Sequence, residues 1–149
     1  MSEFLEFSTG KFTFKIATDC LYIPEGVWIR VQGTTFCVGI SDYLQQRSGD
    51  VAFAEIKPAG TQLTAGDEFA VLETIKVDLS LGAPVSGALV AANPALETAA
   101  ELINQDPYGA GWMAEIRPAD WEAESVGLLS PAAYLAWAQA EAEQETRLK

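Results

Sequence analysis

The chain has 149 residues, with 9 basic and 21 acidic side chains and a formal net charge of −12. A chain of this length that is 49% hydrophobic can bury roughly 68–70% of its extended surface as one domain, which argues against disorder as its main state. It contains no histidine, so catalytic relays that use histidine and histidine-bound zinc are excluded. Its few, dispersed basic residues also argue against a nucleic-acid partner.

The two cysteines, Cys20 and Cys37, are too few for a disulfide scaffold and lack the spacing of a metal site. We therefore expect both to be small core residues. The first six residues include Glu3 and Glu6, where a targeting signal would carry basic residues. No apolar stretch approaches the ~18 residues that would suggest a membrane span. The sequence thus predicts a cytoplasmic protein with no membrane partner.

The first third of the chain is predicted to be mostly β-structure. Apolar and polar residues alternate in two short runs over residues 4–16, and a turn separates them, which is typical of a β-hairpin. A turn at residues 24–26 precedes a further alternating segment from Val27 to Val31. Another strand is predicted over residues 35–38.

The middle of the chain begins with a short helix, predicted between Ser41 and Gly49, because serine caps a helix start and glycine favours its end. Residues 51–56 alternate again. A period-two pattern then runs from Phe69 to Leu81. A single strand of that length would exceed the usual range of 3–10 residues, so the chain must turn within it. No Asn-Gly or Asp-Gly dipeptide marks the position of that turn.

The last third combines strands and helices. Residues 88–92 and 112–116 are predicted strands, and residues 95–103 a helix whose first turn begins with Pro94. Ser130 and Pro131 are a suitable cap and first residue for a terminal helix, in which one face holds Tyr134, Trp137 and Ala138. No linker or repeat divides the chain, so we expect a single domain over residues 1–149.

No group of side chains forms a convincing catalytic set. Glu73 and Asp78 are paired carboxylates that could act as acid and base, but alternation places acidic residues on solvated faces. The segment Gly109-Ala110-Gly111 is too short for a nucleotide-binding loop and lacks the lysine of a P-loop. The polypeptide is therefore predicted to take part in catalysis only by carrying a borrowed reactive group.

Lys76 is the residue that draws attention. It is the only lysine between Lys57 and Lys149, and it lies near the middle of the long alternating run, where a turn is required. Alone, it would be interpreted as a solubilising charge. Its sequence surroundings change that interpretation. They comprise Gly66-Asp67 before it, Glu73-Thr74 beside it and Pro84-Val85-Ser86-Gly87 after it.

This spacing resembles the hairpin of lipoyl and biotinyl carriers, and the wider pattern resembles the H protein of the glycine cleavage system. The resemblance covers roughly residues 22–137. It is carried by Val38-Gly39-Ile40-Ser41-Asp42-Tyr43, Gly49-Asp50, Glu73-Thr74-Ile75-Lys76, Pro84-Val85-Ser86-Gly87, Asn93, Leu96, Leu102-Ile103-Asn104, Asp106-Pro107-Tyr108-Gly109 and Gly111-Trp112.

The resemblance implies a mainly β fold with flanking helices, of the flattened β-barrel or barrel-sandwich type, and a C-terminal helix. It implies that Lys76 carries lipoate through an amide bond at a turn over residues 74–77, that Glu73 and Thr74 flank it as part of the motif, and that the protein is a carrier rather than an enzyme. A lipoate ligase or lipoyl transferase is then a partner. Biotin is the rival cargo, but Ile75 and Val77 stand where biotinyl carriers usually have methionines. A monomer is expected.

Three segments follow from the resemblance. We expect residues 1–20 to form an added N-terminal hairpin, residues 21–118 to form the core that resembles H protein, and residues 119–149 to form a helical C-terminal segment.

Two departures from the family pattern concern the cargo. The chain has Gly26-Val27-Trp28 where His-Glu-Trp is usual, and Ser80 where an acidic residue is common. Loss of two carboxylates disfavours holding a cationic aminomethyl group. We therefore predict an H-like lipoate-binding protein of bacterial sulfur oxidation, with a heterodisulfide-reductase-like complex as partner.

Two alternatives stay open. One is a glycine cleavage H protein that works with glycine decarboxylase, aminomethyltransferase and dihydrolipoyl dehydrogenase. The other is a structural interaction module whose hairpin is never modified.

Large apolar residues give the packing predictions. Those expected in the interior or at its seam with the helices are Trp28, Phe36, Phe53, Phe69, Val71, Leu79, Leu81 and Trp112. Trp121 and Trp137 are expected to fasten the C-terminal segment. Each large aromatic residue could contribute a few kcal/mol when buried.

Overall fold

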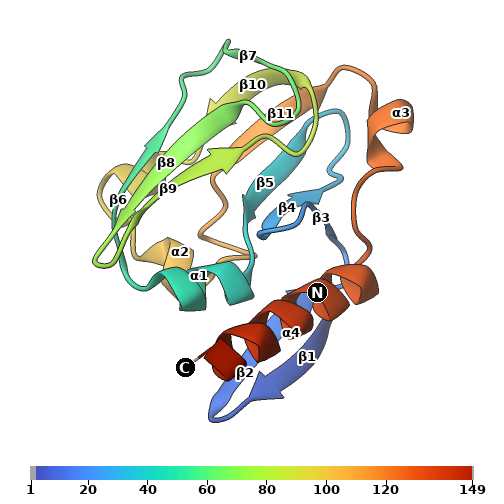
Figure 1. Cartoon of the computed structure of the whole chain (residues 1–149). Coiled ribbons are helices and arrows are strands. Elements are labelled where there is room, and N and C mark those ends of the chain that lie inside the picture. Colours follow the sequence, from blue (N-terminus) through green and yellow to red (C-terminus); the bar gives the residue numbers. More distant parts are fainter. Residues whose placement is uncertain (1–2, 149) are drawn as a thin grey trace.

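The described residues contain three antiparallel sheets (Figure 1). The computed structural model describes residues 3–148, so Met1, Ser2 and Lys149, at the ends of the predicted domain, lie outside the described residues. The two-stranded sheet pairs β1 (Phe4–Thr9) with β2 (Phe12–Ala17). The six-stranded sheet has the order β3 (Leu21–Tyr22), β4 (Val27–Arg30), β5 (Phe36–Ile40), β11 (Ala114–Pro118), β10 (Gly87–Ala92), β7 (Gln62–Leu63). The three-stranded sheet has the order β6 (Val51–Ile56), β8 (Glu68–Thr74), β9 (Asp78–Gly82).

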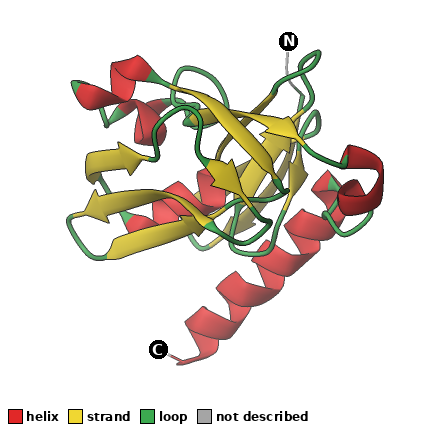
Figure 2. Cartoon of the chain, turned by 90° about the horizontal axis from the view of Figure 1, so that it is seen from above, coloured by secondary structure: helices red, strands yellow, loops and turns green. Residues whose placement is uncertain are grey.

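One helix begins and ends, and another begins, as their sequences predict. Helix α1 (Asp42–Ser48) starts at Ser41, whose hydroxyl oxygen accepts a hydrogen bond from the Leu44 amide, and it ends at Gly49. Helix α4 (Pro131–Leu148) starts at Ser130. Figure 2 shows α4 as one uninterrupted helix to one side of the strands. The short helix α3 (Trp121–Ser125) precedes it.

The helix predicted over residues 95–103 is instead divided into two short pieces. The 3₁₀ helix η1 (Pro94–Glu97) and helix α2 (Leu102–Gln105) occupy this region. The Asn93 side chain accepts from the Ala95 amide and donates to two carbonyl oxygens near β11. These tertiary bonds fix the route of the chain and override its local helix propensity.

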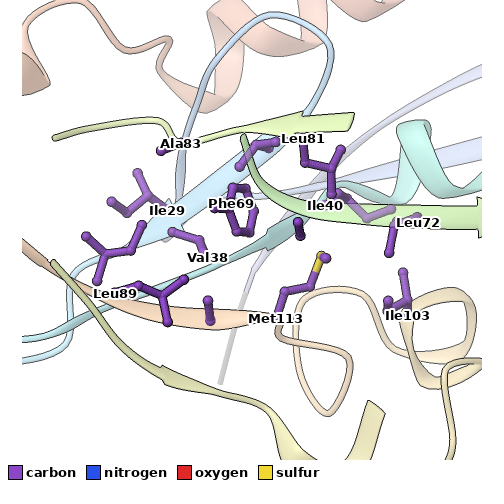
Figure 3. Packing of buried hydrophobic residues seen from close by; sticks show 14 of the residues in the cluster. Ile29, Val38, Ile40, Phe69, Leu72, Leu81, Ala83, Leu89, Ile103 and Met113 are labelled. Carbon is purple, nitrogen blue, oxygen red and sulfur yellow. The ribbon is translucent and has the colours of Figure 1, made fainter. Parts of the chain in front are cut away.

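The larger core lies between the six-stranded and three-stranded sheets (Figure 3). Each sheet contributes buried apolar residues from its inner face. The six-stranded sheet supplies Ile29, Val38, Ile40, Leu89 and Ile116, and the three-stranded sheet supplies Phe69, Leu72 and Leu81. The two-sheet sandwich and the C-terminal helix confirm the predicted fold class.

A second core lies on the opposite face of strand β4. Val27 and Ile29 belong to the larger core, whereas Trp28, between them, packs with the N-terminal hairpin and α4. In this second core the rings of Tyr22 and Tyr134 stack with centroids 4.4 Å apart. Strand β4 is therefore buried on both faces, and Trp28 is fully buried, as predicted.

Two packing predictions were wrong for the same physical reason. Phe53 is 49% exposed, and Val71 is half-buried on the outer face of the three-stranded sheet. A register shift between Val51 and Phe53 and another between Glu68 and Ala70 change which residues face inward. A bulge of this kind adds one residue to a strand, so a strict period of two fails beyond it.

The other predicted packing residues lie inside or at the edge of the two cores. Phe36 is buried and meets the ring of Trp121 edge-on, with centroids 4.7 Å apart. The half-buried residues that pack against a core are Leu79, Trp112, Trp121 and Trp137. Both predicted core cysteines, Cys20 and Cys37, are buried and free.

Candidate functional site

Lys76 lies in the turn that joins β8 to β9, where the long alternating run had to reverse. Figure 1 shows the hairpin that these two strands form. The Thr74 amide donates to the Val77 carbonyl oxygen at 2.9 Å and closes the turn. The Ile75 amide donates to the Asp50 carbonyl oxygen at 3.1 Å, which joins the turn to the segment after α1. The structure thus confirms the predicted reversal over residues 74–77.

The hydroxyl of Thr74 organises this turn. It accepts hydrogen bonds from the amides of Lys76 and Val77 at 3.2 and 3.0 Å, and it donates to the Val77 carbonyl oxygen at 2.8 Å. Side-chain hydroxyls stabilise turns in this way. Glu73, the other predicted flanking residue, is exposed and pairs across the hairpin with Asp78. These contacts hold the backbone of Lys76 while its side chain stays exposed.

The Lys76 side chain extends toward the C-terminal end of α1. Its Nζ atom donates to the Arg47 carbonyl oxygen at 3.2 Å. A helix C-terminus carries partial negative charge, which favours a nearby ammonium group. Gly49 lies beside the stem, because a Cβ atom there would be 3.2 Å from Lys76 Cδ, and its φ of +87° also favours glycine.

Asn104 joins three segments beneath the turn. Its Nδ2 atom donates to Gln45 Oε1 and to the Gly49 carbonyl oxygen, each at 3.0 Å, and its Oδ1 atom accepts from the Val51 amide at 2.9 Å. It therefore ties α2 to the end of α1 and to the start of β6. Sequence reasoning used Asn104 only as part of the family pattern and gave Arg47 no role, since contacts between residues this far apart leave no periodic signal.

The two residues from which the cargo was predicted lie in different environments. Val27 is 1% exposed and packs in the larger core. Ser80 is exposed and donates to Glu68 Oε2 at 2.6 Å. Glu68 in turn lies 3.7 Å from Lys57 Nζ. A carboxylate at position 27 would have to enter an apolar interior, whereas one at position 80 would lie in solvent beside Glu68.

The cysteines are not placed for nucleophilic chemistry. Burial raises the pKa of Cys37 to about 12, although the charge of Arg30 opposes this effect. Burial also raises the pKa of Cys20. Both side chains are therefore thiols at neutral pH, and the thiolate is the reactive form.

Two further kinds of site were sought among the described residues, a cluster of metal-binding side chains and a membrane-spanning helix. Over residues 3–148, histidine, cysteine and acidic side chains do not gather in threes around a point that could hold a metal ion. Among the helices of the same residues, none is long and apolar enough to cross a membrane.

Two packed β-sheets that present a lysine on an exposed hairpin turn define the class of lipoyl-type carrier domains. The glycine cleavage H-protein family model matches residues 20–141. A probable glycine cleavage system H protein of Haloarcula marismortui is 43% identical over 122 residues, which are 82% of this chain and 95% of the relative. A glycine cleavage system H protein of Bacteroides fragilis is 44% identical over 99 residues, which are 66% of this chain and 79% of the relative.

A solved structure supports the same assignment. The crystal structure of a glycine cleavage system H protein from Mycobacterium marinum superimposes with a TM-score of 0.71 at 28% identity, covering 80% of this chain and 95% of that one. The chain belongs to the glycine cleavage H-protein family. Members of this family are non-catalytic carriers with lipoate covalently attached to a lysine.

The surroundings of Lys76 fit such a group. An amide at Nζ would keep one N–H, which is enough to donate to the Arg47 carbonyl oxygen as the ammonium does. The side chain is exposed, so an attached chain would extend into solvent without displacing core residues.

Proposed function

We propose that Lys76 is the lipoyl attachment site and that the chain is the H-protein carrier of a glycine cleavage system. The observation that supports this most directly is the position of Lys76, an exposed lysine at the turn of a hairpin whose backbone is held by Thr74 and Asp50. A modifying enzyme can reach such a lysine without unfolding the domain. The lysine is also separated from both cores, so its charge can be lost without affecting their packing.

The chain's own residues act in this function by holding and presenting the arm. The Thr74 hydroxyl fixes the backbone of the turn, and the Arg47 carbonyl oxygen accepts a hydrogen bond from Nζ. Lipoate, when bound, would supply a disulfide that accepts a group and electrons from a substrate. Tethering keeps that disulfide at high effective concentration near a docked enzyme.

The proposed partners follow from the proposed role. A lipoate ligase or lipoyl transferase would modify Lys76. Glycine decarboxylase, aminomethyltransferase and dihydrolipoyl dehydrogenase would then use the arm in turn. The relatives described above are glycine cleavage system H proteins, and this is the reason for preferring these enzymes.

Intact mass spectrometry tests the attachment site. Wild-type protein incubated with lipoate, ATP and a lipoate ligase should gain the mass of one lipoyl group. Lys76→Arg, which keeps the positive charge, should gain none. The control Lys57→Arg changes an exposed lysine that directly follows β6, and it should gain the same mass as wild type. An unchanged wild-type mass, or a gain that survives Lys76→Arg, would contradict the proposal and favour an unmodified interaction module.

A sulfur-carrying role is the second candidate, and the burial of Val27 and the exposed hydroxyl of Ser80 are the observations that favour it. Neither residue supplies a carboxylate for a cationic aminomethyl group. The relatives reported above give this role, and a heterodisulfide-reductase-like partner, no support. An exchange assay with glycine, bicarbonate and glycine decarboxylase decides between the two. Turnover equal to that of an ordinary H protein would exclude the sulfur role, and turnover at background would exclude the glycine cleavage role.

A further inference from the structure

The N-terminal hairpin precedes the segment that matches the family model, which begins at residue 20. It nevertheless packs closely against helix α1. The rings of Phe14 and Phe7 lie 5.0 and 5.9 Å from the ring of Tyr43, measured between centroids, and both phenylalanines are buried. Buried aromatic contacts of this kind join the hairpin firmly to α1.

Side chains of the family-matched segment also bind the outer edge of β2. The Lys15 amide donates to Asp42 Oδ2 at 2.9 Å, and the Lys15 carbonyl oxygen accepts from Tyr108 Oη at 2.9 Å. The Thr13 carbonyl oxygen accepts from Gln46 Nε2 at 3.0 Å. An edge strand would otherwise leave these backbone groups to water. Two of the three side chains are on α1, so the hairpin holds that helix at two points.

The C-terminal part of α4 also holds α1. The Arg47 guanidinium forms ion pairs with Glu141 and Glu145, and Tyr43 Oη donates to Glu141 Oε1 at 3.0 Å. Glu145, like the hairpin, lies beyond the family-matched residues. The side chain of Arg47 is thus held by α4, while its carbonyl oxygen accepts the hydrogen bond from Lys76 Nζ.

We propose that the N-terminal hairpin and the end of α4 are positioning elements for Lys76. They fix helix α1, and the last turn of α1 fixes the lysine stem through the Arg47 carbonyl oxygen and the segment from Gly49 to Asp50. The inference rests on the proposed function, because it takes Lys76 to be the attachment site. The contacts that connect the hairpin and α4 to Lys76 through α1 are a property of the unmodified chain.

The variant Lys15→Pro, compared with the matched control Lys15→Ala, tests the link. The Lys15 amide points away from β1, since it donates to Asp42, so Lys15→Pro removes that bond without removing one between β1 and β2. Lys15→Ala removes the same side chain and keeps the amide. Hydrogen exchange is measured at the amides of Gly49 and Ile75, which bond to Gln45 and Asp50.

Lys15→Pro is expected to raise exchange at Gly49 and Ile75 at least threefold over Lys15→Ala, and to broaden or shift the Lys76 Nζ resonance in protein labelled with ¹⁵N-lysine. Faster exchange in β1 and β2 with unchanged rates at Gly49 and Ile75 would overturn the proposal. If Lys15→Pro fails to fold, exchange at Gly49 and Ile75 is compared between Gln46→Ala, which removes the bond to the Thr13 carbonyl oxygen, and the exposed control Gln62→Ala. Faster exchange in Gln46→Ala supports the proposal, and equal rates overturn it.

A kinetic measurement distinguishes positioning from general stability. In Lys15→Pro the KM for modification by a lipoate ligase should rise at least threefold while kcat stays near the control value, because the lysine is less often in the presented position. Equal KM values for the two variants would count against the inference. Absence of modification in the wild type would instead contradict the proposed function and leave the exchange result valid.

Discussion

The hydroxyl oxygens of Ser41 and Tyr134 lie 2.7 Å apart in the interior, although 93 residues separate them in the chain. Ser41 also caps α1 by accepting from the Leu44 amide, and Tyr134 also donates to the Glu25 carbonyl oxygen at 3.3 Å. A Cβ atom at Gly26 would lie 2.6 Å from both hydroxyl oxygens. This contact joins α4, α1 and the turn before β4, and it excludes a side chain at position 26.

Removing the Tyr134 hydroxyl should therefore weaken the fold. Tyr134→Phe keeps the stacking on Tyr22 and loses the buried hydrogen bond, which should lower the free energy of unfolding by about 1–2 kcal/mol. Urea denaturation measures the change. The control Ser8→Ala, in an exposed pair with Thr13, should change stability by less than about 0.5 kcal/mol. Equal stabilities for Tyr134→Phe and wild type would mean that the hydroxyl contact is not formed.

The Thr74 hydroxyl should matter for modification more than for stability. Thr74→Val keeps the shape of the side chain but removes all three of its hydrogen bonds in the turn. We expect kcat/KM for lipoylation to fall about tenfold, equivalent to about 1.4 kcal/mol, with little change in the urea midpoint. Thr74→Ser keeps the hydroxyl and should recover most of the rate. Wild-type kinetics in Thr74→Val would show that the turn does not depend on it.

Restoring the two missing carboxylates should have unequal effects. Val27→Glu would place a carboxylate in the larger core and should lower the free energy of unfolding by at least about 3 kcal/mol. Ser80→Asp is exposed and should change it by less than about 1 kcal/mol, with a small loss because of the neighbouring Glu68. Thermal or urea unfolding of both variants measures this. A stable Val27→Glu protein would mean that position 27 can face solvent.

The stability of the protein should fall at alkaline pH in part through Cys37. Its pKa is raised from 9.0 to about 12 by burial, so the folded state binds more protons than the unfolded state between these values. Stability is unaffected by this group below pH 9.0 and decreases as the pH rises from there. Urea unfolding at about pH 8 and about pH 11 should show a smaller decrease for Cys37→Ala than for wild type. Equal decreases would show that the thiol ionises freely in the folded protein.

Local sequence signals predicted much of this fold. Ser41 and Gly49 mark the ends of α1, and Ser130 marks the start of α4, because capping depends on neighbouring residues. The turn at Lys76 followed from the length of the alternating run together with the family resemblance. Phe53 was misplaced because a bulge leaves no trace in a two-residue pattern.

The contacts of the lysine with α1, and those of α1 with the N-terminal hairpin and with Asn104, could not be predicted from the sequence. The Arg47 and Thr13 acceptors are backbone carbonyl oxygens, which every residue possesses. Asn104 acts through partners that are more than fifty residues away. The residue types alone do not show which backbone groups a tertiary fold will bring together.

Lys76 is bound to the body through main-chain contacts and is outside both apolar cores. On the proposed function, folding therefore does not depend on the cofactor at Lys76. Protein made without lipoate would fold unmodified and could be lipoylated later, without new synthesis.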